Sequence, residues 1–196
     1  MKSRSLIFSF LAAFAVAVPA QAQELKFAFQ GTLNSLDPYN LNETFHLGFQ
    51  GNIYEGLIRR GADLAIEPSL ATSWEVIEPT RWRFHLRKGV KFHNGNAFNA
   101  DDVIFSATRV RAEGSDLKTR IAGDTQVKKV DDYTVDFVTA KPNPILHVEW
   151  STWYIMDKEW AEANNAVSPQ NVGGSEENYA TRHANGTGPF VLVSHE

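Results

Sequence analysis

The sequence predicts an α/β fold, in which short strands and amphipathic helices alternate along the chain. Two segments, Ala71–Val76 and Arg81–Leu86, alternate apolar and polar residues, as strands with one buried face do. Asn99 stands where a helix N-cap is expected, with Asp101 and Asp102 in the first turn, where the helix dipole favours negative charge. We therefore expect a half-buried sheet covered by helices.

The first 22 residues have the pattern of a secretory signal peptide. Lys2 and Arg4 precede an apolar run of 13 residues, Leu6–Val18, and the small-x-small tripeptide AQA follows, which predicts cleavage before Gln23. A membrane-spanning anchor would need about 20 apolar residues. The expected product is exported and is released from its leader.

The composition of the remaining 174 residues excludes several classes of protein. They carry 17 Lys and Arg against 23 Asp and Glu, and this net charge of about −6 argues against a general nucleic-acid or anionic-membrane binder. The chain has no cysteine, which excludes disulfides, thiol catalysis, Cys-ligated metals and lipid attachment at the cleavage site. The fold must therefore be held together by its core.

The N-terminal part of the exported chain predicts a strand, a loop and a helix. Leu25–Phe29 alternates and ends at a glycine, as a short strand does. A polar loop follows, with Asp37-Pro38 as its turn. From Thr44 to Ile58 the apolar residues fall mostly at helical spacing, which predicts an amphipathic helix.

The rest of the chain predicts strands joined by tight turns. The helix that begins after Asn99 should run to about Arg111, with Val103, Ser106, Ala107 and Val110 buried. Ile145–Trp150 fits either a short helix or a strand, Asp157–Asn164 fits one or two helical turns, and Asn164–Asn185 is interpreted as a polar surface loop. The further predicted strands are Val90–His93, Gln126–Val130, Tyr133–Thr139, Trp153–Met156 and Phe190–Val193.

The residue patterns typical of catalysis are missing. The six histidines show no metal-ligand spacing, and no serine has the context of a nucleophile elbow. Helix capping explains Asp101 and Asp102 better than acid–base chemistry does. Trp150, Trp153 and Tyr154 cluster after a proline break, where aromatic rings could line a ligand cleft or fill a core. Neither a metal nor a cofactor is expected.

Several motifs together resemble one family, the family 5 solute-binding proteins of bacterial ABC importers, which take peptides, oligopeptides and nickel. They occur in the family's order along the exported chain, and the long segment that begins at Trp82 is the most specific. The motifs are SLDPY (35–39), NIYEGLIRR (52–60), PSLATSWEV (68–76), WRFHLRKGVKFHNGNAFNADDVIFSATRV (82–110), VKKVDDYTVDFVTAKPNP (127–144) and GTGPF (186–190).

The resemblance implies a periplasmic-binding-protein-like bilobal α/β fold of the extended, three-domain type, of which the N-terminal lobe and the small β-rich domain are present. The organisation expected from it is a signal peptide (1–22), the start of lobe one (23–53), the small β-rich domain with returning lobe-one elements (54–157), a polar connector (158–185) and the start of a lobe-one strand (186–196). In the family the chain continues into a second lobe, so the resemblance implies an N-terminal fragment or a truncated reading frame.

The resemblance also implies candidate ligand contacts. The loop after SLDPY supplies contacts in peptide-binding relatives, which indicates Asn42, Glu43 and Thr44. Leu117 lies a few residues past the capped helix, at a position where relatives place an aromatic residue. Trp153 and Tyr154 fall where nickel-binding and other relatives place cleft residues, and a core role for them remains open.

The implied function is that of a periplasmic receptor, a monomer without a lipid anchor, that captures a peptide-like or other small polar solute and presents it to an ABC permease in the inner membrane. It would be neither an enzyme nor a nucleic-acid binder. Two alternatives stay open: a truncated, non-functional fragment, and an exported hydrolase or chaperone-like module. The sequence does not distinguish peptides, metal chelates, sugars and opines as the ligand.

Overall fold

The computed structural model describes residues 26, 28–170 and 177–195. The chain divides into two compact units, residues 1–30 and 31–196, and the second carries the described helices and strands. In the first unit, Lys26, Ala28 and Phe29 form no strand, so the strand predicted over Leu25–Phe29 is wrong at these positions. The predicted signal peptide lies outside the described residues.

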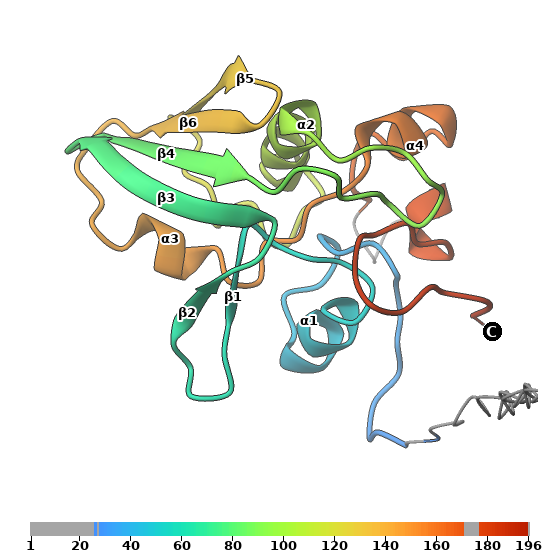
Figure 1. The fold of residues 1–196 in the computed structure, drawn as a ribbon. Coiled ribbons are helices and arrows are strands. Elements are labelled where there is room, and N and C mark those ends of the chain that lie inside the picture. The colour runs from blue at the N-terminus through green and yellow to red at the C-terminus, as the bar shows by residue number, and fades with distance from the viewer. Residues whose placement is uncertain (1–25, 27, 171–176, 196) are drawn as a thin grey trace, which may run out of the picture. The chain divides into compact units, whose positions relative to one another are not determined.

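The centre of the second unit is a four-stranded antiparallel sheet with the strand order β3-β4-β6-β5 (Figure 1). Its strands confirm the four predicted around these positions, with small shifts at the ends. A separate hairpin of β1 (Ile58–Arg60) and β2 (Ile66–Pro68) was not predicted, because strands of three residues are too short to show alternation. The sheet strands are β3 (Ala71–Glu78), β4 (Arg81–Leu86), β5 (Gln126–Asp131) and β6 (Thr134–Val138).

One face of the sheet forms much of the core. Along β4, Trp82, Phe84 and Leu86 are buried while the residues between them are partly exposed, as the alternation predicts. Phe84 lies opposite Val135 of β6, and Trp82 lies opposite Phe137. Burial of these large side chains supplies the main driving force for folding in a chain without disulfides.

The helix predicted after Asn99 is confirmed as α2 (Ala100–Val110). The side chain of Asn99 accepts a hydrogen bond from the backbone N–H of Asp101 at 2.7 Å, and Asp102 accepts one from the backbone N–H of Asn99 at 2.9 Å. These bonds satisfy N–H groups that the first turn leaves unpaired. The predicted buried stripe is also confirmed, and α2 contacts β5, β6 and α4 (Lys158–Ala163).

The helix predicted over Thr44–Ile58 is much too long. The structure has α1 only over Thr44–Gln50, after which the chain turns. The turn frees the backbone carbonyls of Asn52 and Ile53, which accept hydrogen bonds from the N–H groups of Phe190 and Gly188. Pairing with this distant segment outweighs the helical spacing of the apolar residues.

Glycine is required where the segment 186–190 passes the chain at Ile53. A Cβ atom on Gly186 would lie 2.0 Å from the carbonyl oxygen of Ile53, and a Cβ on Gly188 would lie 2.6 Å from its carbonyl carbon. Only residues without a side chain allow this approach of two backbones. The GTGPF motif therefore acts as a contact between segments far apart in the sequence.

Three further predicted strands, besides Leu25–Phe29, are not formed as strands. Val90–His93 and Trp153–Met156 each contribute a single bridge, Lys91 with Ala97 and Tyr154 with Gly56. Phe190–Val193 does not form a strand. The backbone N–H of Phe190 donates a hydrogen bond to the carbonyl of Asn52, but among the described residues no neighbouring strand pairs with the rest of this segment. An apolar run forms a strand only where a partner continues the ladder.

The segments between the main elements are more ordered than predicted. Ile145–Trp150 adopts the helical alternative, α3 (Leu146–Glu149), and α4 confirms the predicted turns after Asp157. The interpretation of 164–185 as a loop with almost nothing to bury is wrong for Ala166 and Ala180, which are fully buried. A short 3-10 helix, η1 (Tyr179–Thr181), also lies in this stretch, while residues 171–176 are outside the described part.

Candidate functional site

The SLDPY motif folds into a buried turn that positions the loop carrying three of the predicted contacts. Asp37 accepts a hydrogen bond from the backbone N–H of Tyr39 at 3.0 Å, and its own N–H donates to the hydroxyl of Ser35 at 3.1 Å. Asn40 donates from its side chain to the same hydroxyl. All four side chains are buried, so the chain leaves this turn in a fixed direction.

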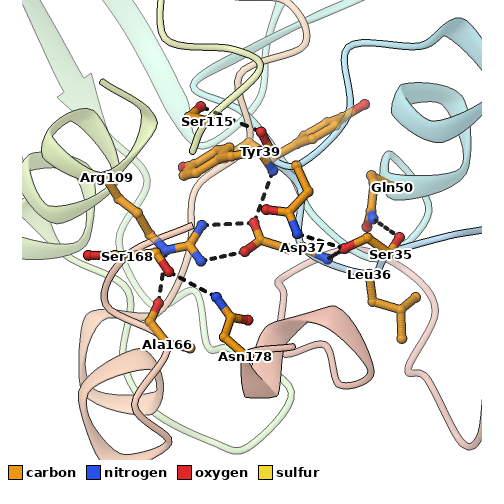
Figure 2. Close-up of polar contacts among 12 residues, drawn as sticks. Ser35, Leu36, Asp37, Tyr39, Gln50, Arg109, Ser115, Ala166, Ser168 and Asn178 are labelled. Atoms are coloured by element: carbon orange, nitrogen blue, oxygen red, sulfur yellow. Dashed lines mark hydrogen bonds and ion pairs between the residues drawn. The ribbon is translucent and has the colours of Figure 1, made fainter. Parts of the chain in front are cut away.

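Arg109 of α2 anchors the turn from the other side (Figure 2). Its guanidinium donates two hydrogen bonds to the Asp37 carboxylate, one of 2.8 Å to Oδ1 and a shorter one to Oδ2, and its Nε donates to the carbonyl of Ala166 at 2.9 Å. Both side chains of the ion pair are fully buried. Burial alone would lower the pKa of Arg109, but the facing Asp37 carboxylate raises it above its usual value, so the guanidinium stays charged.

Tyr39 connects this ion pair to two other parts of the chain. Its ring lies 5.2 Å from the Arg109 guanidinium. Its hydroxyl donates a 2.6 Å hydrogen bond to the carbonyl of Tyr154, and its own carbonyl accepts one of 3.0 Å from the N–H of Asp116. The turn thus holds the segments around Asp116 and Tyr154 beside it, which are the segments that carry the remaining predicted contacts.

The structure places Asn42, Glu43 and Thr44 on the surface, with Asn42 and Glu43 in the loop that leads into α1 and Thr44 at the first residue of the helix; this segment is called loop 42–44. The guanidinium of Arg120 donates to Oδ1 of Asn42 at 3.2 Å, so the loop lies against the segment that follows α2. These exposed polar groups can contact a solute without rearrangement of the core. Their role as ligand contacts remains a prediction.

The structure encloses the side chains of Leu117 and Trp153 completely. Trp153 packs edge-on against Trp150 and Phe137, and its indole N–H is buried without a hydrogen-bond partner among the described residues. Both residues belong to the core. This is the core role that the aromatic spacing left open. At Leu117 the neighbouring Asp116 and Lys118 are exposed, whereas beside Trp153 Thr152 is only partly exposed and Tyr154 is buried.

Tyr154 lies between the core and a surface pocket of about 460 Å³. Its hydroxyl donates to the carbonyl of Leu47 in α1 at 2.7 Å, and burial raises its pKa to about 12, so it remains a neutral phenol. Glu55, Ser69, Ser151 and Thr152 also line the pocket, and Ser69 donates to Glu55 at 3.2 Å. A pocket of this size with a few polar groups suits a small polar ligand.

Sequence reasoning missed Asp37 and Arg109, the residues that hold the site together. Asp37 was assigned only to a turn, and Arg109 falls next to the predicted buried stripe of α2, where an arginine is normally exposed. The available signal was a charged residue, Arg109, beside the apolar stripe of α2. This signal does not identify Asp37 as the partner, because the two residues are 72 positions apart in the sequence.

The described part contains no group of three or more His, Cys, Asp or Glu placed to hold a metal ion. In the same part of the chain no helix has the length and apolar content to cross a membrane.

A concave pocket with a few polar groups on a packed scaffold is the usual form of a small-molecule site. The chain belongs to the bacterial extracellular solute-binding proteins of family 5, whose middle-region profile, described as "Bacterial extracellular solute-binding proteins, family 5 Middle", matches residues 65–196. The resemblance seen in the sequence motifs is thereby confirmed, and so is the α/β fold of periplasmic binding proteins.

Relatives and solved structures agree with this family. The chain is 30% identical over 214 residues to the dipeptide-binding protein of Escherichia coli strain K12. The aligned region covers 95% of this chain and 38% of the relative. The periplasmic binding protein DppA of Helicobacter pylori, solved with the peptide STSA, is 26% identical with a TM-score of 0.67, covering 83% of this chain and 35% of that one. MoaA from A. tumefaciens R10, solved with mannopinic acid, is 27% identical with a TM-score of 0.70, covering 84% and 33%.

The chain spans little more than a third of the length of these proteins.

A further relative carries a different kind of name. The HTH-type transcriptional regulator SgrR of Escherichia coli strain K12 is 30% identical over 131 residues, which cover 65% of this chain and 20% of that protein. The region shared with this chain therefore occurs in proteins with different names and different overall lengths.

Proposed function

We propose that this chain forms part of the solute-binding surface of an extracytoplasmic receptor for an ABC importer. The solute would be peptide-like or another small polar compound. The observation that carries the proposal is the buried network of Asp37, Arg109 and Tyr39, which holds the exposed loop 42–44 and the segments around Asp116 and Tyr154 on one rigid scaffold. Family membership supports the same activity.

The relatives support this range of solutes. One is named a dipeptide-binding protein, and two solved structures hold a peptide and mannopinic acid. Because the loop 42–44 offers an amide, a carboxylate and a hydroxyl, it can pair with either donors or acceptors of a solute. A peptide and an opine both present such groups.

The proposal includes the place of action and the partners. A chain with the N-terminal pattern of a signal peptide would act in the periplasm, as a monomer, and would deliver its solute to the permease complex in the inner membrane. The proposed activity is binding without a chemical step, and domain closure around the solute would exclude water.

The test is calorimetric titration of the purified protein with L-Ala-L-Ala, mannopinic acid and the nickel–histidine complex. We expect saturable binding of at least one compound. The variants Asn42→Ala and Glu43→Gln should weaken it about three- to tenfold, since each removes a polar contact. Lys91→Ala serves as the control, since Lys91 is also exposed and lies on a different segment of the chain.

Because Asn42 and Glu43 are exposed, both variants should keep the thermal midpoint of the parent protein. If a compound binds with the same affinity to the parent and to both variants, the loop is not part of the binding surface. If none of the compounds binds, the receptor function is refuted for this panel of solutes.

A further inference from the structure

A second pocket, of about 450 Å³, lies between the loop that follows α2 and the segment that joins β6 to α3. One wall is formed by residues 119–125 and the other by residues 139–149. Its lining residues differ from those of the pocket beside Tyr154, so the two pockets are separate. Its volume falls in the range of sites for small molecules.

The two walls of this pocket are held in place by their own hydrogen bonds. The carbonyl of Thr125 accepts a 2.8 Å bond from the Arg111 guanidinium, and the carbonyl of Arg120 accepts one of 2.8 Å from the indole N–H of Trp150. On the other wall, the side chain of Asn143 accepts from the N–H of Ile145. Since both walls are fixed, the pocket exists without a ligand.

The charges that line the pocket balance. Arg120 and Lys141 supply two positive charges, and Asp124 and Glu149 supply two negative ones. Arg120 bonds to Asn42, and Glu149 accepts from Asn143 at 2.9 Å, but no ion pair joins any of the four to another charged residue in the described part of the chain. Charges of both signs are therefore available to a ligand.

Thr125 and Leu146 complete the wall of the pocket. Thr125 is 3% exposed, and its hydroxyl oxygen is buried from solvent, so this hydroxyl is not offered to a ligand in the pocket. The side chain of Leu146, which is almost fully buried, adds an apolar surface.

We propose that this pocket binds a small dipolar molecule that carries both an ammonium and a carboxylate group, such as a free amino acid. A carboxylate can turn toward Arg120 and Lys141 while an ammonium turns toward Asp124 and Glu149. A ligand with a single net charge meets repulsion as well as attraction there, and an apolar ligand would desolvate four charges without compensation. The proposal does not depend on the solute bound beside loop 42–44.

The test is a titration of the isotope-labelled protein followed by two-dimensional NMR. L-Alanine is the probe, and propionate and L-alaninamide are the matched controls, because each lacks one of the two charged groups. We expect saturable shifts of the backbone amides in 119–125 and 139–149 with a Kd on the order of 1 mM for L-alanine. The two controls should bind at least about fivefold more weakly.

Two variants test the pocket itself. Asp124→Asn keeps the shape of the side chain and removes one of the two negative charges, so the protein should stay folded while L-alanine binds about two- to fivefold more weakly. Lys141→Ala should weaken binding about two- to fivefold, and Lys91→Ala, outside the pocket, should have no effect.

Three results would overturn the proposal. They are the absence of saturable shifts in these two segments, equal binding of propionate or L-alaninamide, and binding that neither Asp124→Asn nor Lys141→Ala weakens. Shifts confined to residues 42–44 would also overturn it, although they would support the proposed function. The two proposals can therefore fail separately.

Discussion

Replacement of Arg109 by methionine should strongly destabilise the protein. The substitution removes two hydrogen bonds to Asp37 and one to the Ala166 carbonyl, and it leaves the Asp37 carboxylate fully buried without a countercharge. Removal of one partner from such a pair costs about 3–5 kcal/mol, because the remaining charge keeps its desolvation penalty. For a domain whose total stability is about 5–15 kcal/mol, this is a large fraction.

The assay is urea unfolding followed by far-UV circular dichroism. The double variant Asp37→Asn/Arg109→Met should recover part of the loss, since it no longer buries an unpaired charge. Arg182→Met is the matched control, because it breaks the bidentate pair with Glu177, where both side chains are about half exposed and solvent screens the charges. The reasoning is refuted if Arg109→Met lowers the free energy of unfolding by less than about 1 kcal/mol, or by no more than Arg182→Met does.

The remaining predictions concern backbone contacts, a hydrogen bond and pH. Gly186→Ala should destabilise the protein by about 2 kcal/mol or more, because the added Cβ would meet the Ile53 carbonyl. Gly123→Ala should be nearly neutral, because the space around Gly123 is open. Equal urea denaturation midpoints for the two variants would contradict this prediction. Tyr39→Phe should cost about 1–2 kcal/mol in the same assay, because the Tyr154 carbonyl loses its 2.6 Å donor, and an unchanged midpoint would show that water replaces the hydroxyl. Burial raises the pKa of Asp102 from 3.8 to about 6, so the native state holds the proton on this carboxyl more tightly than the unfolded state does. The protonated carboxyl therefore contributes its full stabilisation of the folded state below about pH 4, and this stabilisation is lost as the pH rises through about 6. The stability of the parent relative to Asp102→Asn should therefore fall by about 2–3 kcal/mol between pH 4 and pH 7, and parallel pH curves for the two proteins would argue against the raised pKa.

The elements with strong local signals were predicted well. The alternation in Arg81–Leu86 gave both the strand and its buried face, and the Asn99 cap gave the start of α2 to the residue. Both signals are local, since period-two burial and capping depend on a few neighbouring residues. The sheet order β3-β4-β6-β5 was not predicted, because strand pairing is set by contacts between distant segments.

The wrong predictions fail at long-range contacts. The apolar spacing of Thr44–Ile58 favours a continuous helix, but Asn52 and Ile53 pair with the segment 186–190 instead. Phe190–Val193 has the composition of a strand and lacks a neighbour to pair with in the described part. In both places tertiary contacts outweigh local propensity, which is a weak determinant of structure.

Part of the candidate site could be predicted and part could not. The exposed loop 42–44 came from the motif resemblance, and the structure leaves these residues accessible. Sequence spacing could not show that Leu117 and Trp153 are enclosed, because apolar and aromatic residues look the same in a cleft and in a core. The Asp37–Arg109 pair was beyond the reach of local patterns, as its two residues come from a turn and a distant helix.

The most direct test of the account is hydrogen–deuterium exchange of the purified protein with and without a saturating solute from the calorimetric panel. The account predicts slower exchange in the loop that includes Asn42 to Thr44 and in the neighbouring segment around Asp116 to Lys118, because both lie on the proposed binding surface. Exchange on β3, at the far edge of the sheet, should not change. Protection that appears only on the sheet, with no effect in the loop or its neighbour, would contradict the proposed role of this surface.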